Sequence, residues 1–457
     1  MAVTILAVGL LVFFGHLLAD FFQRAKVPDV LILMLAGIVL GPVLHLIEPA
    51  DFGKVGPVFT TLALIIILFE GGIHLNVRHL GAAAGDTLAI SLSTLLVTVL
   101  LLAYLAELFL PIDFFTALLV AMILGGTSSA VVVPLIRVLR MAPKPSTVLF
   151  LESALTDVVI IVLALGLLQA LAQGSVDAAA AAITPSLALD VARSFLIAGL
   201  IGIGGAFLWS AILERIRKVP NTVFTTFAYV FILFGLAELW GYSGAIAALA
   251  FGIAVANFPN IPERLFGKVF SFRLAAFAEH ERAFFAEAVF LVKTFFFVFL
   301  GVSMTFADWS TVAVGITLAL AIIVARAPMV RLLASKSISR RDAALMTALV
   351  PKGLAAAVLA SLPVQRGLAN SQVIQETVYS TIFFSILTCA ALVFAIERGL
   401  LEPLSQTWLR KFAAGPATAQ HEEPGPPLLI EPALSMPELI SSLQEPRAIT
   451  DLEDPGD

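Results

Sequence analysis

The sequence has little charge. Only 13% of its 457 residues are Asp, Glu, Lys or Arg, whereas 60% are hydrophobic. A water-soluble protein carries about 25% charged residues, because its surface must be hydrated. A soluble globular enzyme is therefore excluded. The apolar stretches are also far longer than the ~10 residues of a membrane barrel strand. The composition thus predicts a helical protein that crosses the membrane many times.

Cysteine is nearly absent too. Cys389 is the one cysteine of the chain and lies in an apolar run, so it cannot form an intrachain disulfide, and we interpret it as a small core residue. The sequence has no P-loop lysine motif and no paired cysteines, and the glycines of 199–205 lack the βαβ context of a dinucleotide site. We therefore expect no enzyme activity, no cofactor and no nucleic-acid partner.

What the sequence does contain is a long series of apolar segments. Because ~20 apolar residues cross a bilayer as a helix, we expect about thirteen spans. The first lacks a basic start and a small-residue cleavage site, so we interpret it as a span and not as a signal peptide. The expected spans are 3–22, 28–47, 55–76, 81–110, 113–139, 145–173, 188–213, 221–240, 242–257, 284–306, 309–334, 341–363 and 372–399.

Every second loop between these spans is basic, and the loops between them carry almost no Lys or Arg. Because basic loops stay in the cytoplasm, the alternation predicts an outside N-terminus, a cytoplasmic C-terminus and an odd number of spans in the cell (inner) membrane. The basic loops contain Arg24, Lys26, Arg78, Arg137, Arg140, Lys144, Arg215, Arg217, Lys218, Arg264, Lys268, Arg273, Arg282, Lys336, Arg340 and Arg341.

The chain changes character near its end. Residues 1–411 hold the apolar spans, and we expect them to form one transmembrane domain. Residues 412–457 are rich in proline and end in acids, which predicts a disordered cytoplasmic tail. The one long connection, 258–283, is amphipathic and basic, which favours a position at the cytoplasmic membrane interface.

Two passages suggest an internal repeat. Residues 28–41 resemble residues 243–256, and each would be the second span of a six-span half. The fifth span of each half is interrupted, by Gly125–Ser129 in the first and by Val350–Gly353 in the second. With one linking span, the halves enter the membrane in opposite directions. Inverted repeats with paired broken helices mark the binding site in secondary transporters, so we predict an all-α polytopic fold of this kind.

Asp157 is the most informative residue of the chain. It lies ~12 residues into the predicted span 145–173, hence ~18 Å deep at 1.5 Å per residue. Ser153 lies one turn earlier on the same helical face, whereas Glu152 and Thr156 share a second face. A carboxylate with a hydroxyl offers hard oxygen ligands to an alkali cation. Asp157 can bind a proton or a cation, but not both at once, and such competition is sufficient for exchange.

Other charges within apolar runs have more than one interpretation. Glu152 is best explained as structural, with Arg326 or Lys293 as its partner. Glu70, followed by two glycines, is either a second ligand or entry-funnel acid, or an interfacial helix cap. Lys293 either extends its ammonium to the interface or serves as a counter-charge to the site acids. Lys352 lies in the second break, where a cation can compensate the charge of a broken helix.

Four motifs in one order resemble a known family. They are residues 28–42, the LFEGG of 68–72, Gly125–Ala130 and Leu151–Asp157. Over about residues 1–400 the sequence is similar to the monovalent cation:proton antiporters, which include the sodium/proton exchangers. The resemblance implies a core domain with two crossed, unwound helices, a dimerisation domain that forms a homodimer, and alternating access by an elevator-like movement.

The resemblance also implies roles for single residues. Asp157 matches the ion-binding aspartate, and Ser153 and Thr127 match auxiliary ligands. Glu70 matches an acid near the site in the sodium/proton branch. Thr156 stands where the electroneutral branch has Asn and the electrogenic branch has Asp, and we include it in the expected site.

The stoichiometry is left open by the remaining residues. Glu152 with Arg326 resembles the stabilising ion pair of the sodium/proton branch. A single titratable site acid favours one-for-one exchange, but Lys293 resembles the membrane lysine of the electrogenic branch. Lys352 departs from the branch that has Arg at its position.

The sequence therefore predicts a secondary-active antiporter that exchanges a monovalent cation for H⁺ and serves pH homeostasis. Na⁺ is the favoured cation and K⁺ is possible, with Asp157 as the alkali-cation ligand. Two alternatives stay open at this point. One is an organic-anion transporter on a similar inverted-repeat scaffold. The other is a potassium efflux or channel-like membrane protein.

Overall fold

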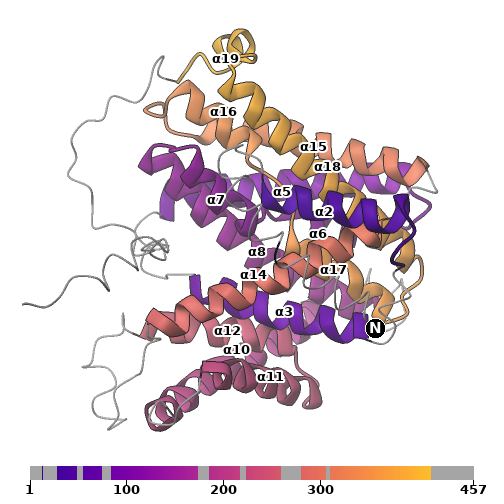
Figure 1. Cartoon of the computed structure of the whole chain (residues 1–457), viewed down its shortest axis with the longest axis vertical. Helices are drawn as coiled ribbons and strands as arrows, with labels where there is room; N and C mark the ends of the chain where they lie inside the picture. Colours follow the sequence, from indigo (N-terminus) through magenta and orange to yellow (C-terminus); the bar gives the residue numbers. More distant parts are fainter. Residues whose placement is uncertain are drawn as a thin grey trace, which may run out of the picture. The chain divides into compact units, whose positions relative to one another are not determined.

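A computed structural model of the chain describes Phe13 and residues 28–48, 55–74, 84–172, 185–216, 223–258, 279–304 and 309–412 (Figure 1). Throughout this part of the chain the regular elements are helices, and no strand occurs in it. The expected all-α fold is confirmed. Apart from Phe13, the first predicted span lies outside the described residues, and so do most of the connection 258–283 and nearly all of the tail 412–457.

The described helices follow the predicted spans closely. In chain order they are α2 (Asp29–Ile38) with its π-helical continuation η1 (Val39–Val43), α3 (Val55–His74), α5 (Ala84–Phe109), α6 (Phe114–Gly125), α7 (Ser129–Val138), α8 (Pro143–Ala172), α10 (Pro185–Ile216), α11 (Val223–Leu239), α12 (Gly244–Asn257), α14 (Glu279–Val302), α15 (Trp309–Leu333), α16 (Arg340–Ala348), α17 (Leu354–Gln365), α18 (Ser371–Glu397) and α19 (Glu402–Trp408).

Seven described helices are long and apolar enough to cross a membrane, and five shorter apolar helices accompany them. The count of about thirteen spans is not confirmed by this finding. One of the shorter helices, Leu354–Gln365, is half of a predicted span that is split at its break, and the other four have fewer than 18 residues. A further short helix, α19, was not predicted, since it follows the last apolar run.

The contacts divide the helices into two groups. The first group contains α5, α6, α7, α8, α15, α16, α17 and α18, and the second contains α2, α3, α10, α11, α12 and α14. In the second group, Phe69 of α3 packs against Phe227, Phe251 and Phe285 from three other helices. Helices α2, α3 and α14 also touch α17 or α18 of the first group.

Close helix crossings repeat within the second group. A Cβ on Gly37 of α2 would lie 2.2 Å from the backbone oxygen of Val298 in α14. A Cβ on Gly72 of α3 would lie 2.5 Å from the backbone oxygen of Leu249 in α12. Only glycine permits such close backbone approach. Gly37 lies in residues 28–41, the first passage of the sequence repeat, and contacts α14 at Gly301. In the same way, residues 243–256, the second passage, contact α3 at Gly72. The matching crossings support two related halves.

The two broken helices meet at their interruptions. The first break separates α6 from α7, and the second separates α16 from α17. The backbone N–H of Ser128 donates to the carbonyl of Pro351 at 2.9 Å. A Cβ on Gly353 would lie only 2.0 Å from Oγ of Ser128, so any larger residue there would push the breaks apart. The breaks were predicted from glycine and proline, and the contact between them joins the two halves.

Short polar residues fix where the halves of these broken helices begin. Asp113 accepts hydrogen bonds from the backbone of Phe115 at 3.0 Å and of Thr116 at 3.1 Å, and so caps α6. Partial burial opposes ionisation of this carboxyl, but hydrogen bonds from Thr116 and Phe115 outweigh it and lower the pKa of Asp113. Ser339 caps α16 in the same way, accepting from the backbone N–H of Asp342 at 3.0 Å.

Candidate ion-binding site

Lys352 places a positive charge at the end of α6. Its Nζ donates to the carbonyl of Gly126 at 2.7 Å and to that of Gly125 at 3.3 Å, and the side chain is buried. These carbonyls end a broken helix, where the peptide dipoles concentrate partial negative charge. A lysine of the second break thus compensates the helix end of the first.

Hydroxyl groups hold the unwound backbone of both breaks. The N–H of Thr127 donates to Oγ1 of Thr156 at 3.2 Å, and the N–H of Lys352 donates to Oγ of Ser385 at 2.9 Å. In each case the hydroxyl comes from the next helix after the broken one, α8 for the first break and α18 for the second. Such bonds are needed because hydrocarbon offers no water to free backbone groups. Thr127 and Thr156, both predicted for the site, therefore meet directly.

Asp157 lies beside the first break and is partly buried. Ser129, the first residue of α7, donates from Oγ to Oδ2 of Asp157 at 3.0 Å. Ser153 lies one turn before Asp157 and is fully buried, with its Oγ donating to the carbonyl of Phe150 at 3.0 Å. Lys352 attracts the Asp157 carboxylate across the break. A carboxylate, hydroxyls and unwound backbone thus gather at one place.

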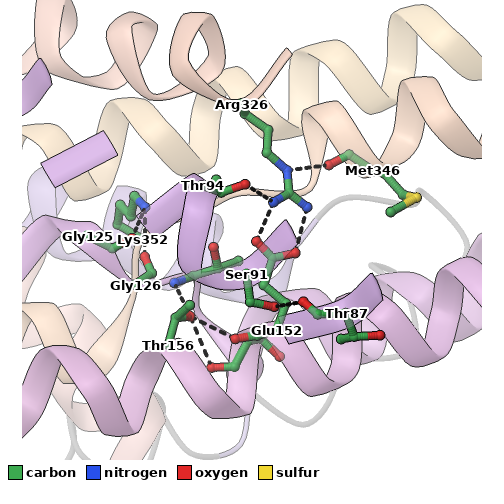
Figure 2. A network of polar contacts seen from close by, with 12 residues as sticks. Thr87, Ser91, Thr94, Gly125, Gly126, Glu152, Thr156, Arg326, Met346 and Lys352 are labelled. Atoms are coloured by element: carbon green, nitrogen blue, oxygen red, sulfur yellow. Dashed lines mark hydrogen bonds and ion pairs between the residues drawn. The ribbon is translucent and has the colours of Figure 1, made fainter. Parts of the chain in front are cut away.

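Glu152 has a different environment, five residues before Asp157. Both its carboxylate oxygens accept from Arg326, with the second bond, to Oε2, at 2.6 Å. Figure 2 shows the guanidinium held between α8, Thr94 of α5 and the end of α16. Arg326 also donates to Oγ1 of Thr94 at 3.2 Å and to the carbonyl of Met346 at 3.1 Å. Both charged side chains are buried and satisfied, which is the arrangement a buried ion pair requires.

The two acids of α8 therefore differ in what they can do. Glu152 is neutralised by a bidentate guanidinium, which stays charged at any relevant pH. Asp157 accepts from a neutral hydroxyl, and no salt bridge to it is found among the described residues. Of the two acids of α8, Asp157 is therefore the one that no cationic side chain neutralises by a direct bond.

Lys293 does not lie beside the acids of α8, where one interpretation of the sequence placed it. Its Nζ forms an ion pair with Asp29 of α2 at 2.7 Å and lies near the ring of Phe290. The expectation that Lys293 is a counter-charge to Glu152 or Asp157 therefore fails. The reason is the close crossing of α2 with α14, which brings Asp29 within reach.

Glu70 occupies the partly buried end of α3. Helix α3 packs against α17, so Glu70 belongs to a helix that borders the second break. The role of Glu70 as a ligand stays a prediction.

Ser129 is the residue that sequence reasoning missed. It was noted as part of the first break, but no role was assigned to its hydroxyl. A serine at the first position of a half-helix, directly after an unwound stretch, is the signal that points to it. The peptide carbonyls of Gly125 and Gly126 were missed as well, because their partner lies 226 or more residues away in the chain.

Comparison with known proteins decides the family. The sodium/hydrogen exchanger transmembrane family matches residues 9–395, which is most of the chain. The chain belongs to the sodium/hydrogen exchanger family. The family resemblance inferred from the four sequence motifs is thereby confirmed.

Curated relatives of this chain are named as antiporters. The K⁺/H⁺ antiporter NhaP2 of Shewanella sp. (strain MR-4) is 23% identical over 388 residues, which are 82% of this chain and 63% of the relative. The chain thus spans less than two thirds of that protein's length. The Na⁺/H⁺ antiporter 1 of Methanocaldococcus jannaschii is 26% identical over 156 residues, covering 33% of this chain and 35% of that one.

A solved structure shares the fold of this chain. The sodium proton antiporter MjNhaP1 from Methanocaldococcus jannaschii, at pH 8, superimposes with a TM-score of 0.63 and 21% identity. The match covers 85% of this chain and 99% of that structure. The predicted fold class is thereby confirmed, apart from the number of spans.

Proposed function

We propose that this protein is a secondary-active antiporter that exchanges a monovalent cation for H⁺ at Asp157. The observation that carries the proposal is the contrast within α8, where Glu152 is neutralised by Arg326 and Asp157 is not. A proton and a cation then compete for one carboxylate beside two unwound backbone segments. Competition at one site couples the two fluxes, because either ion must leave before the other binds.

The ligands of the cation follow from the neighbours of Asp157. We infer that the Asp157 carboxylate binds the ion together with the hydroxyls of Ser129 and Ser153 and with Thr127 of the unwound segment. Hard alkali cations prefer oxygen ligands of this kind. Thr156 supports the site, since its hydroxyl holds the backbone of Thr127.

The two helix groups suggest how access alternates. The first group carries both breaks and Asp157, and the second group adjoins it through α2, α3 and α14. We infer that the first group is the core domain that moves, and that the second group forms the dimerisation domain of a homodimer. The charges of the breaks are compensated within the first group, so that group can move without exposing them.

The cation is assigned from chemistry and from the relatives. The NhaP2 relative is named for K⁺/H⁺ exchange and the Methanocaldococcus relative for Na⁺/H⁺ exchange. We propose Na⁺ or K⁺ as the substrate, with Na⁺ favoured by the motifs LFEGG and Leu151–Asp157. The protein then serves pH homeostasis in the inner membrane, with its basic loops and its C-terminus in the cytoplasm.

Proteoliposomes test the proposal. A pH-sensitive dye inside the vesicles should report proton movement when a Na⁺ or a K⁺ gradient is imposed, and Asp157→Asn should abolish it. The matched control is Asp113→Asn, which removes a carboxylate but keeps a helix-capping side chain. The control should retain exchange, and the preferred cation should appear as the one with the lower half-maximal concentration.

Three results would contradict the proposal. Exchange that persists in Asp157→Asn would remove Asp157 from the site. Transport of an organic anion that does not depend on Asp157 would assign the protein to the first alternative class. Cation conductance without proton movement would instead assign it to the channel-like class.

A further inference from the structure

Three basic side chains converge at one end of α15. Arg331 lies in the last turn of that helix, Lys336 lies in the loop that leads to α16, and Lys411 follows α19. These residues come from three separate segments. The positive-inside rule explains why they lie on one side of the membrane, but not why they lie close together.

The three side chains come together because the segment after α18 folds back against the end of α15. The ammonium of Lys411 donates to the carbonyl of Ala334 at 2.9 Å and to that of Leu332 at 3.4 Å, at the end of α15. The guanidinium of Arg331 lies 4.4 Å from the ring centroid of Trp408 in α19. Arg340 donates to the carbonyl of Phe412 at 3.3 Å, and the Phe412 side chain is buried. These contacts fix Lys411 in place beside Arg331 and Lys336.

The converging charges have no counter-charge in the part of the chain that the structure describes. Arg331 and Lys336 are exposed, and none of the three forms an ion pair there. Partial burial lowers the pKa of Lys411, and the nearby charges of Lys336 and Arg331 lower it further. Arg341, a close sequence neighbour, differs because it pairs with Glu397 at 2.6 Å. The cluster therefore repels itself and favours a bound anion.

Apolar side chains are exposed directly beside this cluster. Leu332 is 70% exposed and Leu333 36%, and both follow Arg331 on the last turn of α15. Trp408 is 44% exposed next to the Arg331 guanidinium. Tryptophan is enriched where a membrane meets water, and basic clusters beside membrane helices bind anionic headgroups. An anionic surface with an apolar part fits this site better than a purely acidic peptide does.

We propose that Arg331, Lys336 and Lys411 bind the phosphate headgroup of an anionic phospholipid, whose acyl chains cover Leu332 and Leu333. The site lies on the side of the membrane where α15 and α18 end. It is separate from Asp157 and does not depend on the proposed exchange. Bound lipid would hold α19 against α15 and α16, and so stabilise the end of the helix that carries Arg326.

The test uses the purified full-length protein in a neutral detergent. Its melting temperature is measured with added phosphatidylglycerol, with phosphatidylcholine and with inorganic phosphate. We expect phosphatidylglycerol alone to raise the melting temperature, by several degrees. Lys336→Gln, which removes an exposed charge, should lose at least half of that rise. The matched control is Arg366→Gln, an exposed basic residue after α17, which should keep the full rise.

Other outcomes would overturn the proposal. Equal stabilisation by inorganic phosphate would show a site for a free anion, and equal stabilisation by phosphatidylcholine would show no need for charge. An unchanged rise in Lys336→Gln would place lipid elsewhere. If lipid acts only after Asp451, Glu453 and Asp454 are neutralised together, the cluster belongs to the chain's own acidic end.

Discussion

The hydroxyl of Ser129 is the closest side-chain partner that the structure gives to Asp157. Its bond spans the gap between the first residue of α7 and the middle of α8. A hydrogen bond to a charged group contributes about 1.5–3 kcal/mol, which corresponds to roughly ten- to hundredfold in an equilibrium constant. The orientation of the Asp157 carboxylate therefore depends on a residue outside its own helix.

We expect Ser129→Ala to raise the cation concentration for half-maximal exchange about tenfold, because the carboxylate loses a partner that orients it. Ser129→Thr retains the hydroxyl and should stay close to the wild-type value. Proteoliposome exchange at a series of cation concentrations measures both variants. Equal values for the alanine variant and the wild type would show that Ser129 neither orients Asp157 nor contacts the ion.

At the scale of helices, Arg326 connects four elements. From α15 its guanidinium reaches Glu152 of α8, Thr94 of α5 and the last carbonyls of α16 through Met346. The end of one broken helix is thus compensated by Arg326, and the end of the other by Lys352. Each broken helix thus has its own cation.

Removal of Arg326 should destabilise the whole first group of helices. Arg326→Ala leaves the carboxylate of Glu152 buried without a partner, and a broken buried ion pair costs about 3–5 kcal/mol. The melting temperature in detergent should fall accordingly. The double variant Glu152→Leu with Arg326→Met removes both charges and should recover much of the loss. A melting temperature in Arg326→Ala equal to that of the wild type would contradict this account.

Local features of the helices could be predicted from the sequence, and long-range partners could not. The interruptions Gly125–Ser129 and Val350–Gly353 were predicted because glycine and proline act on their own backbone. The acid that pairs with Lys293 was not, because Asp29 lies 264 residues away and several acids were equally plausible. Ser153 and Asp157 were placed on one face by helical spacing, whereas Ser129 entered the site through tertiary packing.

At the scale of the whole molecule, the question is how much charge moves in one cycle. Lys293 pairs with Asp29 and not with Asp157. In the proposed site Asp157 is therefore the acid that exchanges, without a lysine paired to it. We therefore expect one cation for each proton. A transfer of one net charge would couple to the membrane potential by about 2.3 kcal/mol per 100 mV, a roughly fiftyfold shift in the cation gradient.

A clamp of the membrane potential across proteoliposomes tests this stoichiometry. We expect the cation gradient at which proton flux stops to be the same at 0 mV and at about −100 mV. Asp29→Asn is the informative variant, because it leaves Lys293 without its acid. A reversal point that moves with potential in the wild type would show that protons and cations do not exchange one for one.

The dependence of the first half on cations of the second half has a consequence during synthesis. When the ribosome has completed α8, the membrane already holds the Glu152 carboxylate and the carbonyls of Gly125 and Gly126. Arg326 and Lys352 are still untranslated, and they arrive only with α15 and the second break. Until then, the inserted first half holds the Glu152 carboxylate and the end of α6 without the cations that compensate them. Its final structure is settled only when the last third of the chain has been inserted.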